Sequence, residues 1–223
     1  LGAKTRSGPF HANMIESWLT NDPGLVIVSP SNPQDAYDLL IEAHHLPDPV
    51  VFLEHIGLYG LRGGKTGWGG SINQIVDTNS VKERVAGDTS IGKARVLRGG
   101  GDISVVTWGA MVHVALEASK SLGERGIEVE VIDLRTLLPF DSKTCIDSVI
   151  RTGRMIVLQE SQWTGGFGHT VASRIVEEAF WRLESPPVVL GALDTPVPFS
   201  PTLEDHTIPN SVLVARHIER ACV

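Results

Sequence analysis

The chain of 223 residues lacks the features that mark several classes of protein. Only two cysteines are present, Cys145 and Cys222, and they stand far apart, so no disulfide framework is indicated and a reducing compartment is expected. No apolar run reaches the length of a membrane span. The net charge is -7 and no cluster of lysine and arginine occurs, which argues against nucleic acid as a partner.

The signatures of several common catalytic sites are also missing. The sequence has no Gly-x-Ser-x-Gly elbow, no phosphate-binding Gly-Lys-Ser/Thr and no His-x-x-x-His spacing for zinc. Residues 165–168 (Gly-Gly-Phe-Gly) lie between an expected strand and an expected helix, where backbone N–H groups could hold an anion. Val171 stands where a dinucleotide motif needs its third small residue, so a tight turn that requires glycine is the favoured interpretation.

What is present is a repeated alternation of buried strands and helices from residue 92 onward. Residues 129–141 give its clearest unit: an apolar strand, a polar turn, Asp141 at a helix N-cap and Gly153 where that helix should end. This order predicts a doubly wound α/β domain over 92–223. The expected strands are 94–97 (at the edge), 102–108, 127–134, 155–158 and 187–190, and the other helices cover 110–122, the residues after Gly168, and 208–221.

Residues 1–56 predict a helix over 11–20, a strand over 24–29, a helix from Pro33 and a strand over 49–54. Two strands cannot form an independent parallel sheet covered on both faces, so this part is interpreted as the end of a domain whose earlier strands are absent. The alternative is that both strands join the sheet of the second domain. Residues 57–91 are a glycine-rich connection, either functional or a linker.

His11 differs from the other histidines by following Gly8-Pro9-Phe10 at the expected start of a helix. The positive end of a helix dipole favours a neutral imidazole, which suits acid–base chemistry. From spacing alone, a capping or surface role is nevertheless favoured. His44 and His45 follow a helix and are expected at the surface.

The amino-acid sequence of these segments resembles that of the β subunit of the E1 component of 2-oxoacid dehydrogenase complexes, of the pyruvate, branched-chain or acetoin type. The resemblance covers nearly all of the chain except about residues 56–90, where Trp68 and the glycines have no counterpart. The matching segments are 11–18, 23–31, 49–55, 91–94, 102–113, 129–141, 152–154, 164–168 and 194–199.

The resemblance implies an α/β fold in which the end of a thiamin pyrimidine-binding domain (1–56) precedes a transketolase C-terminal-type domain (92–223). It implies an enzyme that oxidatively decarboxylates a 2-oxoacid and transfers the acyl group to lipoyl-E2. The cofactors would be thiamin diphosphate and Mg2+, held mainly by the α subunit and by residues upstream of the match. The partners would be an E1 α subunit, a second β subunit and the E2 lipoyl acyltransferase.

The same resemblance points to site residues. His11 matches the family's active-site histidine, in a segment usually written His-Ser-Gln-Ser and here His11-Ala12-Asn13-Met14. Its implied role is proton transfer or hydrogen bonding to the reaction intermediate and to the incoming lipoyl group. A structural K+ would be bound through Ala43, His44, Leu46 and Asp48, although Leu46 replaces the usual aspartate and Asp48 the usual asparagine.

Other interpretations remain open. The chain could be a non-catalytic module for dimerisation or E2 docking, or the C-terminal part of another transketolase-family enzyme such as deoxyxylulose-phosphate synthase. Glu204 and Asp205 could meet a basic E2 domain, but a solvated surface is the favoured interpretation. The resemblance implies a cytoplasmic enzyme in a prokaryote or a mitochondrial-matrix enzyme, although the chain starts at Leu1 and targeting cannot be read from it.

Overall fold

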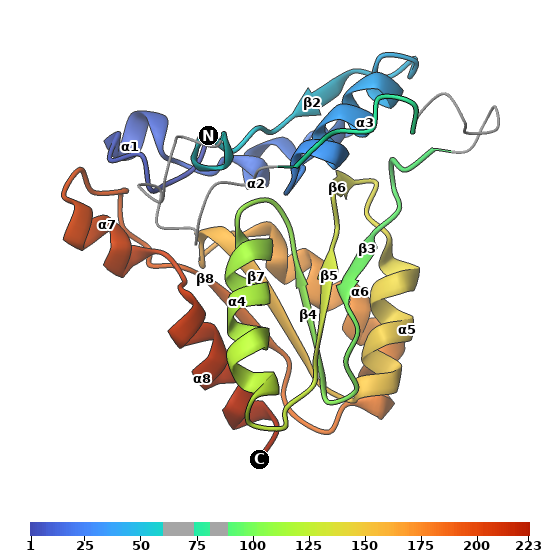
Figure 1. The fold of residues 1–223 in the computed structure, drawn as a ribbon, viewed down its shortest axis with the longest axis vertical. Helices are drawn as coiled ribbons and strands as arrows, with labels where there is room; N and C mark the ends of the chain where they lie inside the picture. Colours follow the sequence, from blue (N-terminus) through green and yellow to red (C-terminus); the bar gives the residue numbers. More distant parts are fainter. Residues whose placement is uncertain (60–73, 81–88) are drawn as a thin grey trace.

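The computed structural model describes residues 1–59, 74–80 and 89–223. A five-stranded sheet is covered on both faces by helices, and a smaller layer lies across one end of it (Figure 1). The predicted doubly wound α/β class is confirmed for residues 92–223. Within the described ranges, every helix is too short or too polar to cross a membrane.

The large sheet has the strand order β3-β5-β4-β7-β8. All neighbouring pairs are parallel except the edge strand β3, which runs antiparallel to β5. β4 and β5 are buried at every position, as expected for central strands covered on both faces. The strands are β3 (Arg95–Arg98), β4 (Ile103–Thr107), β5 (Val129–Asp133), β7 (Met155–Gln162) and β8 (Val188–Ala192).

Two pairs of helices cover this sheet (Figure 1). α4 (Met111–Gly123) and α8 (Ser211–Ala221) lie on one face, while α5 (Ser142–Thr152) and α6 (Phe167–Ala179), followed by η2 (Phe180–Arg182), lie on the other. α5 is confirmed at both ends, because the Asp141 side chain accepts from the Thr144 N–H and Gly153 is left-handed at φ 70°.

Two boundaries in this domain differ from the sequence-based expectation. β7 was expected to end at Leu158, but it continues through four polar residues to Gln162, and the side chains of two of them, Gln159 and Glu160, form hydrogen bonds in the interior. The closing helix starts at Ser211, capped by Asn210, rather than at residue 208. A separate short helix, α7 (Pro201–Thr207), precedes it.

The smaller layer contains a three-stranded sheet in the order β2-β1-β6. Strands β1 (Val26–Val28) and β2 (Val50–Phe52) are parallel, as expected for a strand–helix–strand unit. The third strand, β6 (Thr136–Leu138), comes from the second part of the chain and pairs antiparallel with β1. The expectation of a polar turn between the strand that ends at Leu134 and the N-cap Asp141 is therefore only partly correct, because residues 136–138 form a strand of the other sheet. The described β1 and β2 do not join the large sheet.

α3 (Pro33–Ala43) covers the smaller sheet and is capped by Asn32, whose side chain accepts from the Asp35 N–H. On α3, Leu39 is buried but Leu40 is exposed. The described parts of the connection lie along α3: Ser80 hydrogen-bonds to Asp38, and Thr89 to Glu42 at 2.6 Å. Residues 60–73 and 81–88, including Trp68, lie outside the described residues. The boundaries at 56 and 92 stay a prediction.

Candidate functional site

The carboxyl ends of the parallel strands face the smaller layer (Figure 1). In open α/β sheets this edge is where ligands usually bind. Here the edge is covered by three elements of residues 1–59: the short helices α1 (Gly8–His11) and α2 (Glu16–Leu19), and the turn η1 (Ile56–Leu58). The junction between the two layers is therefore the region to search for chemistry.

His11 is the last residue of α1, not the first residue of a helix. The expectation of one helix over 11–20 that opens at His11 is wrong, and the argument from the positive end of a helix does not apply. Pro9 lies in the first turn of α1, which is where proline favours a helix start. The His11 side chain is exposed to solvent, so a molecule outside the chain can reach the ring.

An open groove of about 970 Å3 lies beside the α1–α2 segment. One wall comes from α1, α2 and the turn between them, and the other comes from the loops after β7 and β8. The ring of Phe10, next to His11 in sequence, is 87% exposed and lines this groove. The full lining is Leu1, Pro9, Phe10, Asn13, Ile15, Trp18, Gln162, Thr164, Asp194, Thr195 and Pro196.

Two buried acidic residues, Glu16 of α2 and Glu160 of β7, lie at the junction between the layers. Glu160 Oε2 is 2.8 Å from His55 Nε2, and Oε1 accepts from the Ala3 N–H at 2.7 Å. The Gly57 N–H donates to His55 Nδ1, so the ring carries its proton on Nε2 and donates it to Glu160. Burial opposes ionisation of Glu160, but the contacts with His55 and Ala3 lower the pKa of this carboxyl below its usual value.

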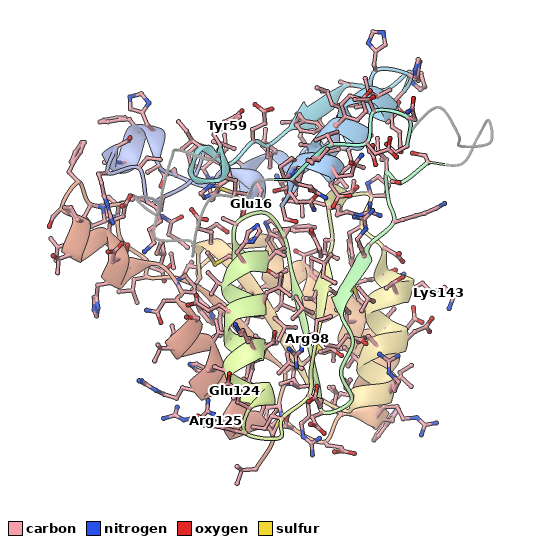
Figure 2. The ribbon with its side chains drawn as sticks, viewed as in Figure 1. Glu16, Tyr59, Arg98, Glu124, Arg125 and Lys143 are labelled. Atoms are coloured by element: carbon pink, nitrogen blue, oxygen red, sulfur yellow. The ribbon has the colours of Figure 1, made fainter. Side chains whose placement is uncertain are left out.

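Glu16 is 0% exposed and, among the described residues, neither of its carboxyl oxygens has a hydrogen-bond partner. Burial, reinforced by the charge of Glu160, raises the pKa of Glu16 to about 7. Weak contacts with Ser161 and Trp108 act in the opposite direction but do not reach hydrogen-bond geometry. Figure 2 places Glu16 between the smaller layer and the end of the large sheet, near the start of α4.

A second polar cluster joins the layers where residues 129–141 cross between them. Arg135, which is left-handed at φ 58°, donates to Asp35 at 3.1 Å and to the Lys93 carbonyl at 2.7 Å. Ser31 donates to Asp133 at 2.5 Å, and burial raises the pKa of Asp133 to about 7. His113 of α4 is 2.7 Å from the Ser31 carbonyl. The cluster links β1 and α3 to β5 and α4.

The glycine loop before α6 confirms the interpretation as a tight turn. The Gly168 N–H donates to Gln159 at 2.6 Å and the Phe167 N–H donates to Ser17 at 3.1 Å, so these amides are used inside the chain. A Cβ atom at Gly166 would stand only 1.6 Å from the Gln159 amide nitrogen. Glycine is therefore required here by close packing against Gln159.

Glu204 corrects the expectation of a solvated surface near the end of the chain. It is 0% exposed and forms an ion pair with Arg6 at 2.6 Å. Asp205 is partly exposed and pairs with Lys4 and Arg6, both at 2.7 Å. The side-chain hydrogen bond from Arg6 lowers the pKa of Asp205. These ion pairs hold the N-terminal segment against α7, so Glu204 and Asp205 do not form an open acidic patch for a basic partner.

The predicted K+ positions lie in the turn after α3. The Ala43 carbonyl accepts from the Leu46 N–H at 3.2 Å, while His44 and Asp48 are exposed. The Leu46 side chain packs against the apolar cluster of the smaller layer. K+ binding stays a prediction. Across the described ranges, no three histidine, cysteine, aspartate or glutamate side chains gather closely enough to hold a metal ion.

The sequence analysis missed the buried polar residues of the junction. Glu16 lies five positions after His11, and Glu160 lies near the carboxyl end of the buried strand β7, where α/β sheets place functional side chains. His55 directly follows the strand predicted over 49–54, and the apolar pattern of that strand gives no sign of a buried histidine. The predicted residue His11 and the missed pair therefore occupy one region: the pair lies inside it and His11 on its surface.

Comparison with known proteins places this geometry in context. The family model "Transketolase, C-terminal domain" matches residues 92–214. The acetoin:2,6-dichlorophenolindophenol oxidoreductase subunit beta of Cupriavidus necator is 40% identical over 96% of this chain and 59% of that protein. The pyruvate dehydrogenase E1 component subunit beta of Bacillus subtilis is 40% identical over 94% of this chain and 59% of that protein. The chain thus spans 59% of the length of these relatives.

A solved structure described as "Split gene transketolase, inactive beta4 tetramer" has a TM-score of 0.67 over 99% of this chain and 64% of that chain. Its sequence is 22% identical to this one, so the likeness concerns the fold alone. The match extends over both layers and supports the fold of residues 1–59 as well as that of the large sheet.

Proposed function

Because the chain belongs to the transketolase C-terminal-domain family and is similar over nearly its whole length to E1 β subunits, we propose that it functions as part of such a β subunit. The reaction would be oxidative decarboxylation of a 2-oxoacid with transfer of the acyl group to lipoyl-E2. The observation that carries the proposal is the 40% identity over 96% of the chain, which includes the His11 segment.

The described residues do not by themselves fit thiamin diphosphate with Mg2+. They include no cluster of three metal-binding side chains, and the glycine loop uses its amides internally. The chain contributes the groove beside α1 and α2, which would form one side of the cofactor and substrate site. We assign the diphosphate and Mg2+ to an α subunit and the pyrimidine to residues upstream of the match, so the chain acts only within an assembly.

In that assembly His11, which is exposed and follows the groove residue Phe10 in the sequence, would face the bound 2-oxoacid. An imidazole can donate or accept a proton or a hydrogen bond. The exposed rings of Phe10 and Trp18 beside it would pack against the partner subunit or the substrate and exclude water. A second β subunit and lipoyl-E2 complete the proposed set of partners.

Reconstitution tests this proposal. The chain is combined with an E1 α subunit, thiamin diphosphate, Mg2+ and pyruvate or another 2-oxoacid, with and without the remaining part of a related β subunit, and CO2 release is measured. We expect activity only when that part is present. If the complete mixture binds stably but releases no CO2 with any 2-oxoacid, the chain is instead a non-catalytic dimerisation or docking module.

A further inference from the structure

Glu16 is a buried carboxyl that the proposed reaction does not use. It is the first residue of α2, it is fully buried, and among the described residues its oxygens accept no hydrogen bond. An ionised carboxylate in that setting would be strongly unfavourable, because burial without partners removes its hydration. The geometry therefore suits the protonated form of Glu16.

The groups around Glu16 come from four segments. Glu160 and Ser161 of β7 and Trp108, which follows β4, act on the Glu16 carboxyl from the end of the large sheet. His55 and the amino group of Leu1 act on Glu160 and keep it ionised. The charge of Glu160 also opposes a second negative charge at Glu16 and so favours the neutral form of Glu16.

The position of Glu16 connects it to His11. α1 and α2 have four residues each, too few to be stable alone, so packing must hold the segment 8–19 in place. Phe10, His11 and Trp18 point outward, while Ala12, Met14 and Glu16 point inward. Glu16 is the one ionisable side chain among the inward-pointing residues of this segment.

We propose that Glu16, in its neutral form, is a positioning residue that fixes the segment 8–19, and with it His11, over the carboxyl ends of the strands. The inference rests on the proposed function only for the role of His11. The anchoring itself concerns this chain alone.

Anchoring by a neutral carboxyl has a defined pH signature. When the segment opens, Glu16 meets water and its pKa returns to the ordinary value of 4.5, whereas in the closed form it is about 7. The closed form therefore binds the proton more tightly, and its advantage is lost as pH rises. The opening equilibrium should increase about tenfold per pH unit between those two values and level off above the higher one.

Hydrogen exchange of the intact 223-residue chain tests the anchor between pH 5 and 8.5. For the amides of residues 8–19, the exchange rate divided by the intrinsic chemical rate gives the opening equilibrium. We expect the tenfold rise per unit in the wild type, levelling off near pH 7, and no rise in Glu16→Gln, which keeps the shape without the charge. Glu16→Ala should open the segment at every pH. Glu117→Gln, an exposed glutamate on α4, is the matched control and should behave like the wild type.

Two results would contradict the anchoring role of Glu16. One is a wild-type opening equilibrium that does not change with pH, and the other is the same rise of the opening equilibrium with pH in Glu16→Gln. The wild-type measurement needs no variant, so it remains decisive if a variant fails to fold. In the assembled enzyme, kcat of the wild type should fall above pH 7 and that of Glu16→Gln should not. If exchange behaves as expected but kcat of both proteins follows one pH profile, the anchor stands and the catalytic role of His11 is wrong.

Discussion

The centre of the large sheet and the junction between the layers are held together by different interactions. The first has an apolar core in which Val105, Val131 and Ile156 are completely buried among aliphatic neighbours. The second contains buried charged groups, including the Asp35–Arg135 ion pair and the Glu160 carboxylate, which His55 contacts. Apolar burial stabilises without regard to geometry, whereas buried charges stabilise only when each is paired. The junction should therefore be the part of the fold that responds to pH and to loss of single partners.

A large effect should follow from removing the charge of Arg135. Arg135→Met keeps the aliphatic stem but leaves Asp35 buried with only the partly exposed Arg95 opposite it, at 3.2 Å. Breaking a buried pair typically costs 3–5 kcal/mol, and because Arg95 remains we expect about 3 kcal/mol. Urea unfolding at pH 7.5 measures the loss. Arg174→Met breaks an exposed pair and should cost less than about 1 kcal/mol. Equal losses would show that the junction is no more sensitive than the surface.

In the apolar sheet, Ile156→Ala should lower the free energy of unfolding by about 2–5 kcal/mol, through lost burial and the cavity left behind. No titratable group is created or removed, so this loss should be the same at pH 5.5 and pH 8. Unfolding curves at both values make the comparison. A loss that depended strongly on pH would mean that the sheet and the junction are not separate in their energetics.

Glu16→Gln should stabilise the protein at high pH. The folded-state pKa of Glu16 is raised from 4.5 to about 7. The contribution of protonated Glu16 to the free energy of unfolding is therefore fully present below pH 4.5 and is lost as pH rises through 7. Removing the ionisable group should raise the free energy of unfolding by at most about 3 kcal/mol at pH 8, and the gain should vanish toward pH 4.5. Unfolding midpoints of both proteins across this range would show it. A gain that does not vary with pH would contradict the buried neutral carboxyl.

The smallest stability effect concerns the turn before α6. Gly166→Ala adds a Cβ atom that must displace the Gln159 amide, at a cost of about 1–3 kcal/mol for an overpacked interior. Gly101→Ala is the control, since nothing lies within 4 Å of the added atom and its backbone is not left-handed. Thermal unfolding separates the two. If Gly166→Ala is as stable as the control, Gln159 does not fix this turn.

Sequence patterns predicted the apolar sheet well and the junction poorly, for a physical reason. The strands of the large sheet and the helix from Asp141 to Gly153 were recognisable because burial and capping leave local signals. β6 has three residues before a proline, and its partner β1 is more than a hundred positions away, so no local pattern marks it. Short apolar runs are ambiguous without their partners.

The same limit applies to the site. The sequence set His11 apart by its position but favoured a capping or surface role, so that only the resemblance indicated catalysis. Its predicted helix position was wrong. Glu16 and Glu160 are polar residues whose burial depends on contacts among the N-terminal segment, His55 and β7. Residue type alone predicts that glutamates are exposed, so sequence reasoning assigns such residues to the surface.

The most direct test of the account compares two exposed histidines in the assembled enzyme. His11→Ala and His45→Ala are each placed in a β subunit completed with its upstream part and an α subunit, and kcat for decarboxylation and acyl transfer to lipoyl-E2 is measured. Both side chains are exposed, so neither variant should change the unfolding midpoint. We predict that His11→Ala lowers kcat by roughly a hundredfold or more, as for loss of a general acid–base group, while His45→Ala retains the wild-type value. A His11→Ala enzyme with the wild-type kcat would contradict the account.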